Sequence, residues 1–91
     1  MDIEDWRSKI DAVDLQILQL LNKRARFSIE IGNIKQQRQL PIHYPDRETL
    51  IIKRLVKVNS GPLSSDGVRR VFERIIDESR KVEKDVLKNN S

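Results

Sequence analysis

The chain has 91 residues, enough for one small domain whose own hydrophobic core is close to the minimum for stable folding. Hydrophobic residues make up 37% of the sequence and aromatic residues 4%, while charged residues reach 35%, which is typical of long amphipathic helices. The absence of cysteine excludes disulfides and thiolate metal sites, and a single histidine excludes a histidine-based zinc cluster. The net charge of +4 permits binding of nucleic acid or of a small anionic ligand.

The sequence begins with MDIEDW, which is acidic and lacks the apolar segment of a secretory signal peptide. No apolar run in the sequence is long enough to span a membrane. We therefore expect a cytoplasmic protein with no membrane partner, folded as a single domain over residues 1–91.

Two breaks divide the chain, and no segment shows the alternation of a β-strand, so an all-α fold is expected. The first break contains Pro41 and Pro45, which forbid a continuous helix. The second break is NSGPLSSDG, whose first four residues, at positions 59–62, form a strong helix stop. Asp46 is the predicted N-cap of the second helix, and Ser64 or Ser65 that of the third. The three predicted helices span about residues 3–38, 46–58 and 64–87.

The first predicted helix carries two adjacent apolar seams, spaced alternately three and four residues apart as in coiled coils. Two seams indicate a helix that is covered from more than one side. At about 50 Å in length, this helix is too long for two shorter helices of the same chain to cover. A partner subunit is therefore expected. The main seam consists of Ile3, Trp6, Ile10, Val13, Ile17 and Leu20.

Four polar residues lie at positions that the helical pattern predicts to be covered, and a buried unpaired charge costs several kcal/mol. For each residue alone, the simple explanation is that a long side chain reaches solvent or that Arg24 and Glu83 pair. Taken together, several polar groups that converge inside a small bundle favour a ligand pocket. The four residues are Arg24, Lys35, Ser79 and Glu83.

Helical geometry places Arg24 and Lys35 within about 20° of one face and about 16 Å apart along the axis. The uncharged Ser28 and Ile31 lie between them on that face. Two long side chains bent inward from such positions leave room for one small anion. Arg7 is about 25 Å from Arg24 along the helix, so it could reach the same pocket only from an antiparallel partner chain.

Nucleic-acid binding is the main alternative from the residues alone, because GVRRVFER could form a recognition helix. However, the basic residues are dispersed among acidic ones rather than clustered. Arg69, Arg70 and Arg74 lie at helical pairing distances from acidic neighbours, which is typical of a solvated face. A purely structural helical dimer is the other alternative.

The sequence resembles the all-helical chorismate mutases of the shikimate pathway over about residues 6–84. The resemblance is carried by WRSKIDAVDLQILQLLNKRARFSIEIGNIK, then YPDRE, then IIDESRKVE. It implies an intertwined homodimer of three-helix chains, with two active sites shared between the chains. It further implies a cofactor-free and metal-free isomerase that converts chorismate to prephenate for phenylalanine and tyrosine biosynthesis.

By this resemblance, Arg24 and the partner chain's copy of Arg7 hold the two carboxylates of chorismate. Lys35 contacts the ether oxygen that leaves carbon, and also a carboxylate. Glu83 faces the same ether oxygen from the opposite side. Lys35, Glu83 and Arg24 are thus the expected catalytic residues.

The resemblance implies supporting roles for four further residues. Glu48 accepts a hydrogen bond from the ring hydroxyl, Arg47 orients Glu48 and its neighbours, and Ser79 assists a carboxylate. Tyr44 stands where some relatives carry an acidic residue in the loop that lines the pocket, so only its backbone is expected to serve there.

Glu83 departs from the family pattern, since that position is often a neutral glutamine. An ionised carboxylate would repel the developing oxyanion, so Glu83 is expected to act only when protonated, and activity is expected to fall as rising pH ionises it. An isochorismate–pyruvate lyase shares this fold and cationic pocket. That enzyme type lacks the acidic residue after the loop arginine, whereas Glu48 is present here.

Overall fold

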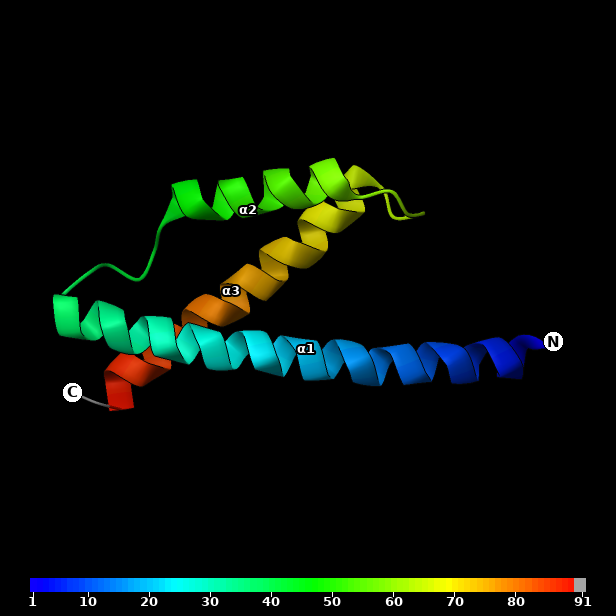
Figure 1. Cartoon of the computed structure of the whole chain (residues 1–91), viewed down its shortest axis with the longest axis horizontal. Helices are drawn as coiled ribbons and strands as arrows, with labels where there is room; N and C mark the ends of the chain where they lie inside the picture. Colours follow the sequence, from blue (N-terminus) through cyan, green and yellow to red (C-terminus); the bar gives the residue numbers. More distant parts are fainter. Residues whose placement is uncertain (90–91) are drawn as a thin grey trace.

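The computed structural model describes residues 1–89, and the helical bounds agree with the predicted ones to within two residues. The predicted all-α fold is confirmed, as no strand occurs in residues 1–89. Figure 1 shows α3 running diagonally from the far end of α2 to the C-terminal half of α1. The helices are α1 (Ile3–Arg38), α2 (Pro45–Val58) and α3 (Ser65–Asn89).

Local side-chain chemistry explains where α1 begins and ends. The Asp2 carboxylate accepts the Asp5 backbone N–H at 3.1 Å, and the Asp5 carboxylate accepts the Asp2 N–H at 2.9 Å, forming a capping box. At the other end Gln39 adopts a left-handed conformation with φ of 56°, and its N–H returns to the last carbonyls of the helix. The chain then leaves the helix axis and enters the loop to Pro45.

The predicted caps of the two shorter helices differ in outcome. Asp46 is not the N-cap of α2, because the helix begins one residue earlier at Pro45, with Tyr44 as an N-cap that makes no side-chain cap bond. Proline suits the first helical position, since its missing N–H would have no intrahelical partner there. Ser64 caps α3 as predicted, since its hydroxyl accepts the Gly67 N–H at 2.9 Å.

Helix α3 packs against both other helices, whereas α1 and α2 make no comparable contact with each other. The buried apolar residues Val68 and Ile76 both belong to α3. Gly32 is buried where α1 meets α3, and a Cβ at that position would lie 3.3 Å from the Glu83 Cα. The absence of a side chain at Gly32 therefore sets how closely Glu83 approaches α1.

The chain is only 14 Å thick along its shortest axis and 54 Å along its longest. Every residue from Met1 to Lys23 is exposed, including Trp6 at 55% and Ile10 at 57%. The main predicted seam, from Ile3 to Leu20, is thus present but uncovered by its own chain.

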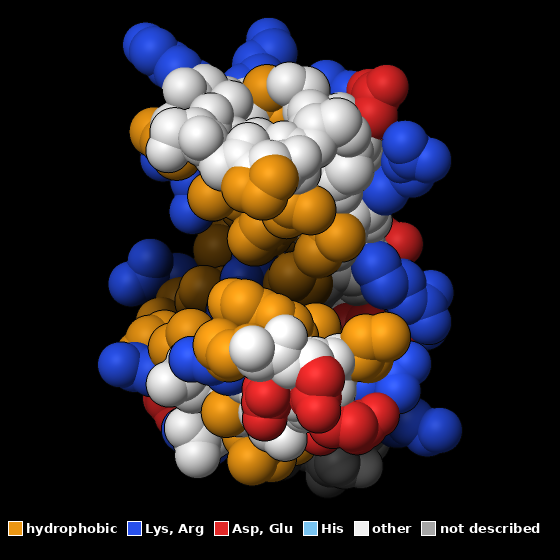
Figure 2. Space-filling model, turned by 90° about the vertical axis from the view of Figure 1, so that its right-hand side faces the viewer, with side chains coloured by type: hydrophobic (Ala, Val, Ile, Leu, Met, Phe, Trp, Pro, Cys, Tyr) orange, Lys and Arg blue, Asp and Glu red, His pale blue; other side chains and the backbone are white. Residues whose placement is uncertain are grey.

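A groove of about 550 Å³ lies between α1 and α3. Figure 2 shows apolar side chains around a hollow between α1 and the end of the molecule where α2 meets α3. The apolar residues of the groove are Ile17, Leu21, Ala25, Val71, Ile75 and Val82.

Within residues 1–89, no helix has both the length and the apolar character needed to cross a membrane.

Candidate active site

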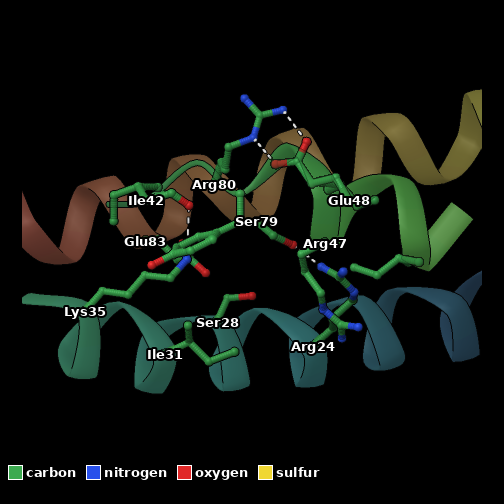
Figure 3. Close-up of a pocket in the computed structure, with 13 residues that line it drawn as sticks. Arg24, Ser28, Ile31, Lys35, Ile42, Arg47, Glu48, Ser79, Arg80 and Glu83 are labelled. Atoms are coloured by element: carbon green, nitrogen blue, oxygen red, sulfur yellow. Dashed lines mark hydrogen bonds and ion pairs between the residues drawn. The ribbon is translucent and has the colours of Figure 1, made fainter. Parts of the chain in front are cut away.

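A cavity of about 440 Å³ lies between the C-terminal half of α1, the first turns of α2 and the middle of α3 (Figure 3). It collects seven of the eight residues that the sequence analysis singled out, because three helices and one loop converge there. Apolar walls come from the α1–α2 loop, α2 and α3. The predicted residues in the lining are Arg24, Lys35, Tyr44, Arg47, Glu48, Ser79 and Glu83.

Helix α1 forms the floor of the cavity in the predicted arrangement. Figure 3 shows Arg24 and Lys35 at opposite ends of the floor with Ser28 and Ile31 between them. Ser28 is 6% exposed, so it is a covered part of the contact between helices. The floor is therefore uncharged in its middle and cationic at both ends.

Lys35 is held by three partners. Its ammonium donates to the Glu83 Oε2 at 2.9 Å and to the Ile42 carbonyl at 3.0 Å, and it lies 4.9 Å from the centre of the Tyr44 ring. Only 13% of the Lys35 side chain and 9% of the Glu83 side chain are exposed. The ammonium thus ties the loop before α2 to α3 and fixes one charged end of the cavity.

Arg24 is positioned by Ser79 at the other end. Its guanidinium donates to the Ser79 hydroxyl, which in turn donates to the Ile75 carbonyl of its own helix at 3.0 Å. The alternative in which Arg24 and Glu83 pair with each other is wrong, because Glu83 lies beside Lys35 instead. No carboxylate within residues 1–89 forms an ion pair with Arg24.

Helix α2 brings Arg47 and Glu48 to the cavity, and Glu48 meets a residue that sequence reasoning misses. Arg80 of α3 lines the cavity and donates to both oxygens of Glu48, at 2.9 and 3.3 Å. Its sequence signal is its place four residues after the buried Ile76, on the same helical face. Reasoning from apolar stripes overlooked it because a single arginine on α3 resembles the solvated ones nearby.

The lining holds more positive than negative charge. It contains four cations and two carboxylates, and the carboxylates are paired with Lys35 and Arg80. Two cations, Arg24 and Arg47, have no ion-pair partner within residues 1–89. An anion that enters this cavity therefore meets unpaired guanidinium groups.

Arg7 is the predicted residue that lies outside the cavity of its own chain. Its side chain is 65% exposed and pairs with Glu4 at 2.7 Å. This agrees with the helical geometry, by which the side chain cannot reach the cavity within one chain.

The alternative of a nucleic-acid recognition helix on α3 concerned other arginines. Along α3, Arg69 pairs with Asp66 and Arg74 with Glu78, as expected for a solvated charged face.

Comparison with known proteins points to one family. The family model for chorismate mutase type II matches residues 6–84. A bifunctional chorismate mutase/prephenate dehydratase from Aquifex aeolicus is 33% identical over 93% of this chain. The chain spans only 25% of the length of that relative.

Solved structures agree in fold and sequence. Chorismate mutase from Thermus thermophilus has a TM-score of 0.88 and 33% identity, covering 90% of this chain and 93% of its own. Chorismate mutase from Helicobacter pylori in complex with prephenate also has a TM-score of 0.88, with 34% identity, covering 94% of this chain and 93% of its own. Because sequence and fold agree over nearly its whole length, the chain belongs to the chorismate mutase type II family.

Proposed function

We propose that this protein catalyses the rearrangement of chorismate to prephenate in the cavity between its three helices. The observation that carries the proposal is a cavity with unpaired Arg24 and Arg47 and, facing Glu83, the ammonium of Lys35. Chorismate is a dianion with a ring hydroxyl and an ether oxygen, so it requires cations, an acceptor and a donor to the ether. Family membership supports the same assignment.

The reaction is intramolecular, which explains why such a site suffices. One carbon–oxygen bond of the ether breaks while one carbon–carbon bond forms, and no proton, electron or water is gained or lost. The barrier falls when the flexible enolpyruvyl group is held over the ring and when negative charge developing on the ether oxygen is stabilised. Preorganised cations in a partly closed cavity provide both effects.

The contacts of each side chain support its proposed role. Arg24, fixed by Ser79, would bind one substrate carboxylate, with Ser79 assisting. Lys35 would donate to the ether oxygen and a carboxylate. Glu83 accepts a hydrogen bond from Lys35 in this structure and would donate to the same ether oxygen only when it carries a proton. These four groups belong to two different helices, so the geometry of the site depends on the packing of α1 against α3.

The remaining residues would complete the site. Glu48 would accept a hydrogen bond from the ring hydroxyl of the substrate, and Arg47 would contribute positive charge beside Glu48. Tyr44 covers Lys35 with its ring and would close the loop side of the cavity. Ile42, whose carbonyl accepts a bond from Lys35, holds the same loop in place.

A homodimer is part of this proposal. The exposed apolar seam of α1, the groove beside α3 and the elongated shape of the chain together support a second copy that packs against these surfaces. Arg24 and Ser79 border both the groove and the candidate active site. A partner α1 in the groove would therefore bring its own Arg7 close to the cavity and complete the binding of the second carboxylate.

The direct test is to mix the purified protein with chorismate and follow the loss of chorismate absorbance, with the product identified by mass spectrometry. Prephenate formation supports the proposal. Salicylate and pyruvate formed from isochorismate, without turnover of chorismate, would establish the lyase instead. Retention of DNA with no turnover of either compound would overturn the enzyme assignment.

A further inference from the structure

Arg80 lines the cavity and makes a two-point polar contact there, but the proposed mechanism gives this residue no role. Its Nε donates to the Glu48 Oε2 at 2.9 Å, and its Nη2 donates to the Oε1 at 3.3 Å (Figure 3). The Arg80 side chain is 27% exposed and the Glu48 side chain 21%. A two-point contact of this kind fixes the plane of a carboxylate as well as its position.

Arg80 is also held from its own helix. Its Nη2 donates to the Asp77 carboxylate, three residues earlier on α3. Two carboxylates thus satisfy this guanidinium, which distinguishes it from the unpaired Arg24 and Arg47. Arg80 is therefore engaged with protein groups rather than available to a substrate carboxylate.

Glu48 would have other partners if Arg80 were absent. The same cavity contains Arg24, Lys35 and Arg47, and attraction between opposite charges strengthens as water is excluded. A mobile Glu48 carboxylate would pair with one of these cations and compete with the dianionic substrate for it. His43 offers little restraint, because it is 57% exposed, lies 3.6 Å from Glu48 and attracts it only when protonated.

We propose that Arg80 is a positioning residue that holds the Glu48 carboxylate away from the substrate-binding cations and orients it toward the substrate hydroxyl. The inference rests on the proposed function. A carboxylate has about four lone-pair positions, and the Arg80 contact uses one on each oxygen. Acceptor capacity therefore remains for the ring hydroxyl of the substrate.

The test is a double-mutant cycle of Arg80→Met and Glu48→Gln, with kcat and KM measured for chorismate. Methionine keeps an unbranched apolar side chain but removes both donors. We expect Arg80→Met to raise KM by roughly tenfold, within the range for coupled charged neighbours, with a smaller change in kcat. In the Glu48→Gln background the same substitution is expected to change KM by less than about twofold, because its target is already neutral. Arg80→Lys, which keeps the charge without the two-point geometry, is expected to recover only part of the loss.

Arg69→Met is the matched control, because Arg69 also bonds an aspartate three residues earlier on α3 but makes no contact with Glu48. It should leave KM unchanged. Isothermal titration calorimetry measures the dissociation constant of prephenate for the same four proteins of the double-mutant cycle. The test therefore does not depend on residual turnover by Glu48→Gln.

The outcomes separate this inference from the proposed function. A wild-type protein that neither converts chorismate nor binds prephenate overturns both. Normal wild-type turnover with equal effects of Arg80→Met in both backgrounds overturns the positioning role alone, because Arg80 would then act independently of Glu48. A KM unchanged by Arg80→Met has the same consequence.

Discussion

The Lys35 ammonium lies 2.9 Å from the Glu83 carboxylate, and the two groups come from different helices to the same end of the cavity. Both are proposed to face the ether oxygen of the substrate, where one must donate as a cation and the other as a neutral acid. An ionised Glu83 can only accept hydrogen bonds. The protonation state of Glu83 therefore decides whether this end of the cavity stabilises or opposes the developing negative charge.

The first prediction concerns the charge of Glu83. Glu83→Gln supplies a permanently neutral donor toward the ether oxygen in place of a carboxyl group that can only accept when ionised, so its kcat is expected to exceed that of the wild-type protein. Steady-state rates of both proteins under the same conditions provide the measurement. A kcat that is unchanged or lower in Glu83→Gln would contradict the proposed role.

The second prediction separates the two cationic ends of the cavity. Lys35→Met removes the positive charge beside the ether oxygen. Negative charge develops on that oxygen only in the transition state, so kcat is expected to fall by about 10²–10³-fold. Arg24→Met removes a contact to a carboxylate that is charged throughout the reaction, so KM is expected to rise by roughly tenfold, with a smaller effect on kcat. Initial rates over a range of chorismate concentrations measure both. The reverse pattern would exchange the proposed roles.

The third prediction tests whether each site uses two chains. Assayed at chorismate concentrations well below KM, Arg7→Ala and Lys35→Met are each expected to retain at most about a tenth of wild-type activity as homodimers. In a mixed dimer, the site with an intact Lys35 would receive an intact Arg7 from its partner. Random pairing after co-refolding should therefore restore about a quarter of wild-type activity.

One control accompanies this experiment. Mixing Arg24→Met with Lys35→Met should restore nothing, because both residues lie in the same cavity of one chain. Absence of recovery in the first mixture, with mixed dimers demonstrated by mass spectrometry, would rule out the contribution of Arg7 across the interface.

The fourth prediction concerns Gly32. An alanine Cβ there would lie 3.3 Å from the Glu83 Cα and 3.4 Å from its carbonyl oxygen, so α3 must shift slightly. Overpacking costs about 1–3 kcal/mol, and the better helix propensity of alanine offsets up to about 1 kcal/mol. We expect a net loss of roughly 1 kcal/mol in the free energy of unfolding, and a fall in kcat because Glu83 moves with α3.

Gly61→Ala is the comparison for this substitution, because a Cβ there meets only the Asn59 side-chain oxygen at 3.8 Å. Chemical denaturation and steady-state kinetics of both variants give the two quantities. Unchanged stability and kcat in Gly32→Ala would show that the contact between α1 and α3 is more tolerant than its geometry indicates.

Features set by local chemistry could be predicted from the sequence. The proline-containing break after α1 and the NSGP break after α2 give the helical bounds, and helical spacing places Arg24 and Lys35 on one floor. Family resemblance adds Glu48 and Arg47, which their own helix pattern does not mark as a site.

Contacts between elements could not be predicted in the same way. Periodicity shows that Glu83 is covered but not which cation covers it, so Lys35 rather than Arg24 as its partner emerges only in three dimensions. The same holds for Arg80, whose bond to Glu48 joins residues 32 positions apart. Such pairings depend on the crossing of α3 over the other helices, which no single-helix pattern encodes.

The exposed N-terminal half of α1 has a consequence for how the protein folds. Most of the stability of a helix in a protein comes from packing of its apolar face, and residues 1–23 are all exposed within their own chain. If a second copy covers them, then folding of this segment and association are one equilibrium. The midpoint of thermal unfolding should then rise with protein concentration, and amide hydrogens of α1 before Lys23 should exchange faster as the protein is diluted.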